Sequence, residues 1–288
     1  MKDVRKVSAS AGAEWLLGGF RLLRQSPVGF GTLGLVYGLI ALVVSLSAER
    51  STPLFALLEL VLVVVAPMLI GGMVYAARTI DQGGHAAPEH LLQAVREGKV
   101  VRLLATLLPQ IAALVLCVLL LVVMVGGGDG LQQMVQTVAQ LQAQATPDPA
   151  LAATLPIGRL LLWLLLVCVV GIVAGFFTFV AAPEIMFTDS SAFDAMRRSF
   201  RACIRNLPAL LVFFVLTVIA ALAVYIAVML VALVVRLFAG AMAMQVVAQL
   251  LSTAVLMPVI AGAMYIGWKQ MLADGAMRQD APASTIAL

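Results

Sequence analysis

The stretch PEIMFTDSSAFDAMRRSFRACIRNLP, residues 183–208, decides the fold because it places a basic amphipathic segment between two long apolar runs. Ser191 and Asp194 form an S-x-x-D helix start, and the spacing that follows predicts an elbow helix over 190–206. Apolar side chains recur on one face of this helix, and arginines lie on the other. Such a helix is typical of a membrane surface, where it lies flat before Pro208 turns the chain into the bilayer.

The composition excludes an aqueous globular fold. Hydrophobic residues make up 63% of the chain, charged residues 11%, and the mean hydropathy is +1.09. A water-soluble fold could not bury that much apolar surface, so the sequence predicts an all-α, polytopic membrane helical bundle. The net charge of +4 does not indicate nucleic-acid binding, because the basic residues are dispersed and have no stacking aromatic residues beside them.

Six apolar runs reach the length of about 20 residues that a helix needs to cross the hydrocarbon core. The predicted transmembrane helices cover 28–46, 54–77, 103–125, 160–182, 209–235 and 242–268. Alternate connections hold 15 Lys and Arg residues in one set and three in the other, namely Arg50, Arg159 and Arg236. The positive-inside rule therefore predicts a multi-pass protein with both termini in the cytoplasm.

The connections carry further helical patterns. Residues 1–27 predict an N-terminal interfacial helix, and 86–99 predict a second elbow that begins near Pro88 and ends at Gly98. A signal peptide cleaved near Ser47 is disfavoured, because the charged segment before the first apolar run is long. The outer connection, 126–159, contains an amphipathic helix between GGGDG and TPDP, and residues 275–288 are expected to be a disordered tail. The outer helix fits either a position on the outer leaflet or a lid over a cavity.

The junctions before three of the spans resemble one another. FRLLRQSP ends at Pro27, VRLLATLLP at Pro109 and FRACIRNLP at Pro208. These echoes are consistent with a three-fold parallel repeat of one elbow helix and one helical hairpin, and also with chance similarity between apolar runs.

Two segments carry a resemblance to a known group. WLLGGFRLLRQSP, residues 15–27, and FTFVAAPEIMFTDSSAFDAMRRSFRACIRNLP, residues 177–208, resemble uncharacterised proteobacterial six-span inner-membrane proteins. That group is similar to YciC-type proteins and to the membrane domain of some glycerophosphodiester phosphodiesterases. The resemblance implies an all-helical bundle with no established reaction.

Basic and aromatic residues of the elbows are the candidates for contact with anionic lipid headgroups. Each Lys or Arg near an anionic leaflet contributes about 1 kcal/mol, and aromatic rings favour the acyl boundary. Topology determination explains the same arginines. The candidates are Trp15, Arg21, Arg24, Arg197, Arg198, Phe200, Arg201 and Arg205.

Polar residues inside the apolar runs form a second set. Glu59 is the acidic residue deepest in a span, and Arg159 and Arg236 lie on the side from which a partner could reach it. The apolar runs also contain amide and hydroxyl side chains, namely Gln110, Gln245, Gln249 and Ser252. These side chains either line a polar path or join helices by hydrogen bonds.

No catalytic, cofactor or metal residues are predicted. His85, Glu89 and His90 lack the spacing of a metal-binding helix, and no nucleophile–base pair can be named. The sequence therefore favours a non-enzymatic protein of envelope maintenance that binds lipids, a membrane-protein partner or a second copy of itself. Two alternatives are a transporter of a lipid or small amphiphile and, more remotely, an intramembrane hydrolase.

Overall fold

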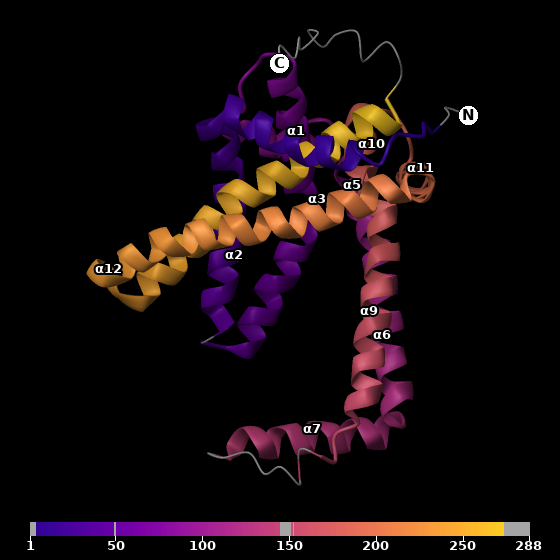
Figure 1. Cartoon of the computed structure of the whole chain (residues 1–288), viewed down its shortest axis with the longest axis vertical. Coiled ribbons are helices and arrows are strands. Elements are labelled where there is room, and N and C mark those ends of the chain that lie inside the picture. Colours follow the sequence, from indigo (N-terminus) through magenta and orange to yellow (C-terminus); the bar gives the residue numbers. More distant parts are fainter. Residues whose placement is uncertain (1–3, 49, 145–150, 152, 274–288) are drawn as a thin grey trace. The chain divides into compact units, whose positions relative to one another are not determined.

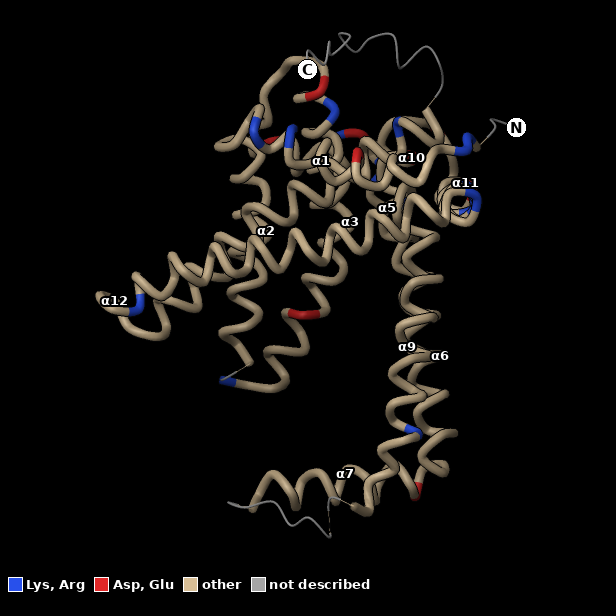
Figure 2. Tube along the Cα trace, in the orientation of Figure 1, with Lys and Arg blue, Asp and Glu red and all other residues tan. Residues whose placement is uncertain are grey.

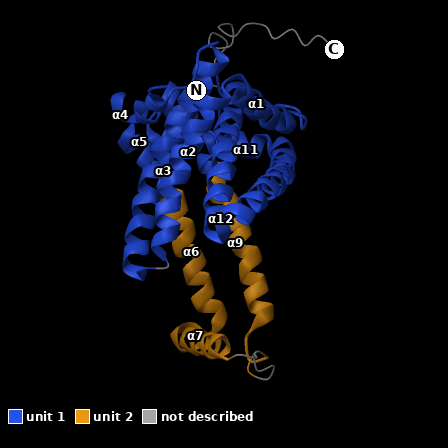
Figure 3. Ribbon diagram, turned by 90° about the vertical axis from the view of Figure 1, so that its left-hand side faces the viewer, with its two compact units in different colours: residues 1–107, 177–288 blue, residues 108–176 orange. Residues whose placement is uncertain are grey.

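The structure, a computed structural model, describes residues 4–48, 50–144, 151 and 153–273. The regular elements in these ranges are all helical. The chain divides into two units, one formed by Met1–Leu107 with Phe177–Leu288 and the other by Leu108–Phe176 (Figure 3). The expected tail over 275–288 and the TPDP segment lie outside the described residues.

Unit 1 contains the longest helix and most of the short ones. Its helices are α1 (Ala11–Gln25), α2 (Pro27–Ala48), α3 (Thr52–Asp81), the 3-10 helix η1 (Pro88–Leu92), α4 (Gln93–Arg96), α5 (Val100–Leu104), the 3-10 helix η2 (Ala105–Leu107), α10 (Ala181–Phe187), α11 (Ala192–Arg205) and α12 (Leu207–Met271) (Figure 1).

Five helical stretches are long and apolar enough to cross a membrane, namely Pro27–Ala48, Thr52–Asp81, Val100–Val125, Ile157–Phe187 and Leu207–Met271. The last is not one straight rod, because Gly240 has a φ of 84° and interrupts it. The two arms of α12 then run side by side and share a cluster of Val228, Ala232 and Ala248 (Figure 1). The chain is thus a multi-pass helical membrane protein.

Helices α1 and α12 pack closely because α1 presents glycines to both ends of α12. A Cβ atom at Gly12 would lie 2.0 Å from the carbonyl oxygen of Ala209, and one at Gly19 would lie 2.2 Å from that of Val259. Any larger residue would therefore push the helices apart. Helix α1 is docked against the beginning and the last third of α12, rather than lying on a surface by itself.

The elbows pack together into a core. Leu103 of α5, Ile185 and Met186 of α10, and Ala195 and Met196 of α11 are buried in one cluster. The structure differs from the single helix expected over 86–99. A 3-10 turn and the short α4 fill this stretch, and Gly98, with a φ of 65°, separates them from α5.

Unit 2 contains α6 (Leu108–Val125), α7 (Gly127–Ala143) and nearly all of α9 (Ile157–Thr178), up to Phe176. The indole Nε1 of Trp163 donates to the Cys117 carbonyl at 2.9 Å, which joins α9 to α6. Gly126 and Gly127 have positive φ angles and turn the chain from α6 into α7. The glycine-rich stretch is therefore a tight turn followed directly by helix, whereas the sequence pattern indicates a longer break before the amphipathic helix.

Candidate functional site

Charged residues of unit 1 gather mainly at the end formed by α1, α5, α10 and α11 (Figure 2). Helix α11 begins after Ser191, whose Oγ accepts from the Asp194 N–H at 3.2 Å and donates to the Asp194 carboxylate at 2.6 Å. Small residues and Met196 form the buried face of α11, which allows it to lie close to its neighbours. This packing fixes which side chains of α11 face outward.

The outward face of α11 is both basic and apolar. Arg197, Arg201 and Arg205 are exposed, and none of them pairs with an acidic residue in the described ranges. Phe193 and Ile204 lie along the edge of this face, with 68% and 54% of their surfaces exposed. Basic heads beside apolar groups suit a position at a membrane surface. We call these five residues the α11 face.

Phe200 is half-buried and does not belong to the exposed α11 face. It stacks on Phe177, with ring centroids 4.4 Å apart. Arg24, in the last turn of α1, is exposed.

Arg198 points inward, although the sequence pattern groups it with the lipid-facing arginines. Its guanidinium Nη1 binds the carboxylate of Glu184, a fully buried residue of α10. Only 16% of the Arg198 side chain is exposed. Phosphate contact through Arg198 is therefore not available in this arrangement, because its charge is already neutralised inside the protein.

Trp15 is also placed differently from the expected membrane anchor. The residue is fully buried, its ring packs near Phe179 and Phe213, and its Nε1 donates to the Gln270 side chain at 2.7 Å. Helical spacing shows that Trp15 lies on the apolar face of α1, but spacing alone does not distinguish lipid from protein as the material against that face.

Glu184 is the centre of a buried polar cluster. Its second carboxylate oxygen accepts from Trp268 Nε1 at 2.7 Å, and its first also accepts from the hydroxyls of Ser190 and Thr188 at 3.2 and 3.3 Å. These bonds tie α10 to α12 and to the start of the α11 elbow. Sequence reasoning missed Glu184, although an acidic residue within the apolar stretch around Ile185 was the available signal.

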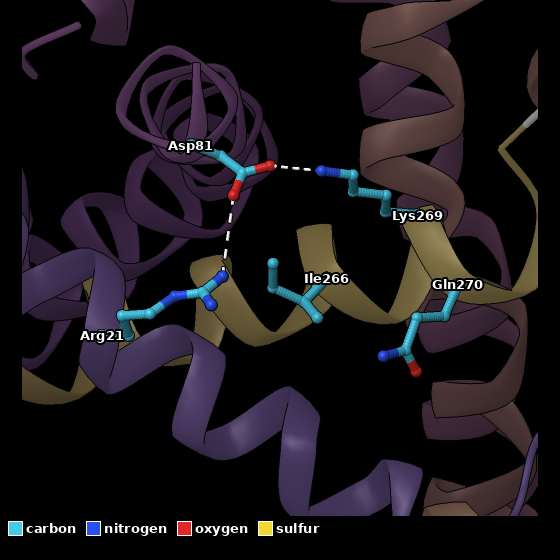
Figure 4. A pocket seen from close by; sticks show the side chains of 5 residues that line it. All are labelled: Arg21, Asp81, Ile266, Lys269 and Gln270. Atoms are coloured by element: carbon cyan, nitrogen blue, oxygen red, sulfur yellow. Dashed lines mark hydrogen bonds and ion pairs between the residues drawn. The ribbon is translucent and has the colours of Figure 1, made fainter. Parts of the chain in front are cut away.

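A second cluster surrounds Asp81 at the end of α3 (Figure 4). One oxygen of the Asp81 carboxylate accepts from Lys269 Nζ at 2.6 Å and from the Tyr265 hydroxyl at 3.0 Å. The other oxygen lies 3.7 Å from Arg21 Nη2, a distance too long for a hydrogen bond. Arg21, Asp81, Ile266, Lys269 and Gln270 line a cavity of about 380 Å³. We call it the α1–α3–α12 pocket.

The acidic and basic intramembrane candidates, Glu59, Arg159 and Arg236, are all exposed. Glu59 is exposed on α3, and no ion pair in the described ranges joins it to Arg236, which is exposed on α12. Arg159 belongs to unit 2, where its Nη1 donates to the Met124 carbonyl at 3.4 Å.

The amide and hydroxyl candidates differ in exposure and lie in different helices, one in α6 and three in α12. Gln110 is exposed on α6, whereas Gln245 and Ser252 of α12 are exposed and half-buried. Gln249 accepts from the Ser45 hydroxyl at 3.3 Å, which links α12 to α2. This bond is of the kind that joins membrane helices.

His90 and Glu89, two of the three residues considered above as metal ligands, contact residues close to them in the chain. His90 Nδ1 accepts from the Ala87 N–H at 3.2 Å, and burial lowers the pKa of His90. Glu89 pairs with Arg96 at 3.8 Å. Over the described part of the chain, no three His, Cys, Asp or Glu residues form a group that could hold a metal ion.

The fold and its polar end together define a multi-pass helical membrane protein with packed elbow helices. The chain belongs to the family described as Domain of unknown function (DUF7847), whose model matches residues 13–266. No curated protein and no solved structure matches the chain.

Proposed function

We propose that the chain is an inner-membrane protein that holds anionic lipid headgroups at its α11 face and acts, without enzymatic activity, in envelope maintenance. The observation that carries the proposal is the exposure of Arg197, Arg201 and Arg205 beside Phe193 and Ile204. Three arginines near an anionic leaflet are worth about 3 kcal/mol in total, which is enough to enrich anionic lipids around the helix.

The proposed topology has six spans and cytoplasmic termini. The interruption at Gly240 supports counting the arms of α12 as two spans, and the excess of Lys and Arg on alternate connections supports the orientation. We also propose that the chain contains a three-fold repeat. We propose further that it is related to YciC-type proteins and to the membrane domain of glycerophosphodiester phosphodiesterases. A membrane-protein partner or a second copy of the chain could share the same surface.

The test is a triple variant, Arg197→Gln with Arg201→Gln and Arg205→Gln, of the full chain in nanodiscs of mixed phosphatidylglycerol and phosphatidylcholine. Native mass spectrometry would count the phosphatidylglycerol molecules that remain bound. The matched control neutralises Arg50, Arg159 and Arg236, the three basic residues of the other set of connections. We expect the α11 variant to lose phosphatidylglycerol and the control to keep it. Equal retention by both variants would refute the lipid-binding role.

Transport of a lipid or small amphiphile is the alternative, with Glu59 and the amides of α12 as a polar path. The Ser45–Gln249 bond favours helix packing at that position. A cysteine at position 249 would separate the two functions, because a packed contact stays unlabelled by a water-soluble maleimide and a water-filled path does not.

A further inference from the structure

The α1–α3–α12 pocket contains more positive than negative charge. Arg21 and Lys269 face one carboxylate, that of Asp81, so the lining carries one net positive charge (Figure 4). Its volume of about 380 Å³ lies within the range of small-ligand sites, about 300–1,000 Å³. The pocket could therefore admit an anionic group of modest size.

The two cations of the pocket are bound to Asp81 very differently. Lys269 Nζ lies 2.6 Å from the carboxylate, and its side chain is 19% exposed. Arg21 lies 3.7 Å away, is 45% exposed, and makes no hydrogen bond to the described residues. Its guanidinium fork is thus available to a second anion, and a fork of this shape binds two oxygens of one phosphate group.

The lining also has an apolar part. Ile266 lies in the wall beside the charged residues (Figure 4). A ligand with a phosphate and a short apolar or glycerol portion would satisfy both parts of the wall. All three charged residues belong to connections with excess Lys and Arg, which places them at the level of the inner-leaflet headgroups in the proposed topology.

We propose that the α1–α3–α12 pocket binds a phosphate group, with Arg21 as its principal ligand, Lys269 as a supporting charge and Asp81 as a competing anion. The inference rests on the proposed lipid-binding function, because a lipid headgroup is one source of that phosphate. A soluble phosphate ester is the other source.

The test compares Arg21→Gln with Arg24→Gln in the full chain. Both variants remove one positive charge from the last turns of α1, but Arg24 does not line the pocket. The probes are phosphatidylglycerol doped into phosphatidylcholine nanodiscs and soluble glycerol phosphate, with binding followed by native mass spectrometry. Loss of one charge-assisted interaction should weaken binding about tenfold or more in Arg21→Gln, with little change in Arg24→Gln.

An Asp81→Asn variant gives a change of opposite sign. Removing the competing anion should tighten phosphate binding. In pure phosphatidylcholine the Asp81→Asn variant should melt at a lower temperature than the native chain, because Lys269 loses its partner. Adding the phosphate probe should restore the melting temperature of this variant. A residue with only a structural role would lose stability without tightening the binding of either probe.

The outcomes separate the two proposals. An Arg21-dependent response to phosphatidylglycerol alone supports the site with a lipid ligand, and one to glycerol phosphate supports it with a soluble ligand. Equal effects of Arg21→Gln and Arg24→Gln on binding would overturn the proposed phosphate site in the pocket, even where the α11 variant still loses lipid. If the α11 variant lost no lipid, the proposed lipid binding at the α11 face would be overturned, even where binding in the pocket still depends on Arg21.

Discussion

Removal of Arg198 should destabilise the protein more than neutralisation of its partner. Arg198→Ala leaves the Glu184 carboxylate charged and fully buried, with its bonds from Trp268 and Ser190 but no counterion. Breaking a buried ion pair in this way costs about 3–5 kcal/mol. Glu184→Gln strands Arg198 instead, whose side chain is 16% exposed and can reach water. We therefore expect Glu184→Gln to cost less, about 1–3 kcal/mol.

The assay is thermal unfolding in detergent micelles, followed by intrinsic fluorescence because Trp268 lies in the cluster. Each kcal/mol corresponds to roughly 2–4 °C in a chain of this size class, so Arg198→Ala should lower the melting temperature by about 6 °C or more. The double variant Glu184→Gln with Arg198→Met leaves no unpaired charge and should recover most of the loss. Two Arg198 nitrogens, Nε and Nη2, are buried without a partner in the described structure, which lowers the net value of the native pair.

The ordering of these variants is the part of the reasoning most exposed to refutation. If the Arg198→Ala variant proved as stable as the Glu184→Gln variant, burial of the Glu184 carboxylate would not require the positive charge of Arg198. If the double variant lost the sum of the two single losses, stranded charge would not be the cause of the destabilisation.

Three further predictions concern the elbows and their packing. Burial raises the pKa of the Cys203 thiol to about 12, so iodoacetamide at pH 8 should leave it unmodified in the folded protein and modify it in SDS, as read by mass spectrometry of a chain whose other cysteines are serine. Burial lowers the pKa of His90 from 6.5, so as the pH falls the imidazole is protonated in the unfolded chain before it is protonated in the folded one. The contribution of His90 to stability should therefore be constant above about pH 6.5 and decline below it. The variant His90→Gln should show a smaller decline in melting temperature over a pH series. Gly19→Val should lower the free energy of unfolding by about 1–3 kcal/mol or more, because the new side chain meets a carbonyl of α12. Gly171→Ala places its Cβ with nothing within 4 Å, so its free energy of unfolding should differ from that of the native chain by no more than about 0.5–1 kcal/mol.

The membrane class and the elbow at α11 follow from the sequence because their signals are local. Long apolar runs need no tertiary context to be recognised, and an S-x-x-D start needs only the few residues around Ser191. The same holds for the break at Gly240, which falls in the connection expected over 236–241.

The candidate site could not be predicted to the same extent, because its contacts join distant parts of the chain. Trp15 and Arg198 have patterns typical of lipid-facing residues, yet their partners are Gln270 and Glu184, and the spacing within one helix carries no information about them. The pocket around Asp81 combines α1, α3 and α12, so no single stretch of sequence displays it.

Docking of α1 against α12 has a consequence for biosynthesis. Trp15 and its partner Gln270 are 255 positions apart, and the Arg5 N–H bonds the Met271 carbonyl. At roughly 5–20 residues per second, the first helix emerges from the ribosome about 10–50 s before its binding surface exists. During that interval α1 has only lipid or a chaperone to cover its glycine-lined side, and a chain that stops short of α12 never covers it. Whether the glycine-lined side of α1 is covered by α12 thus depends on complete translation of the chain through α12.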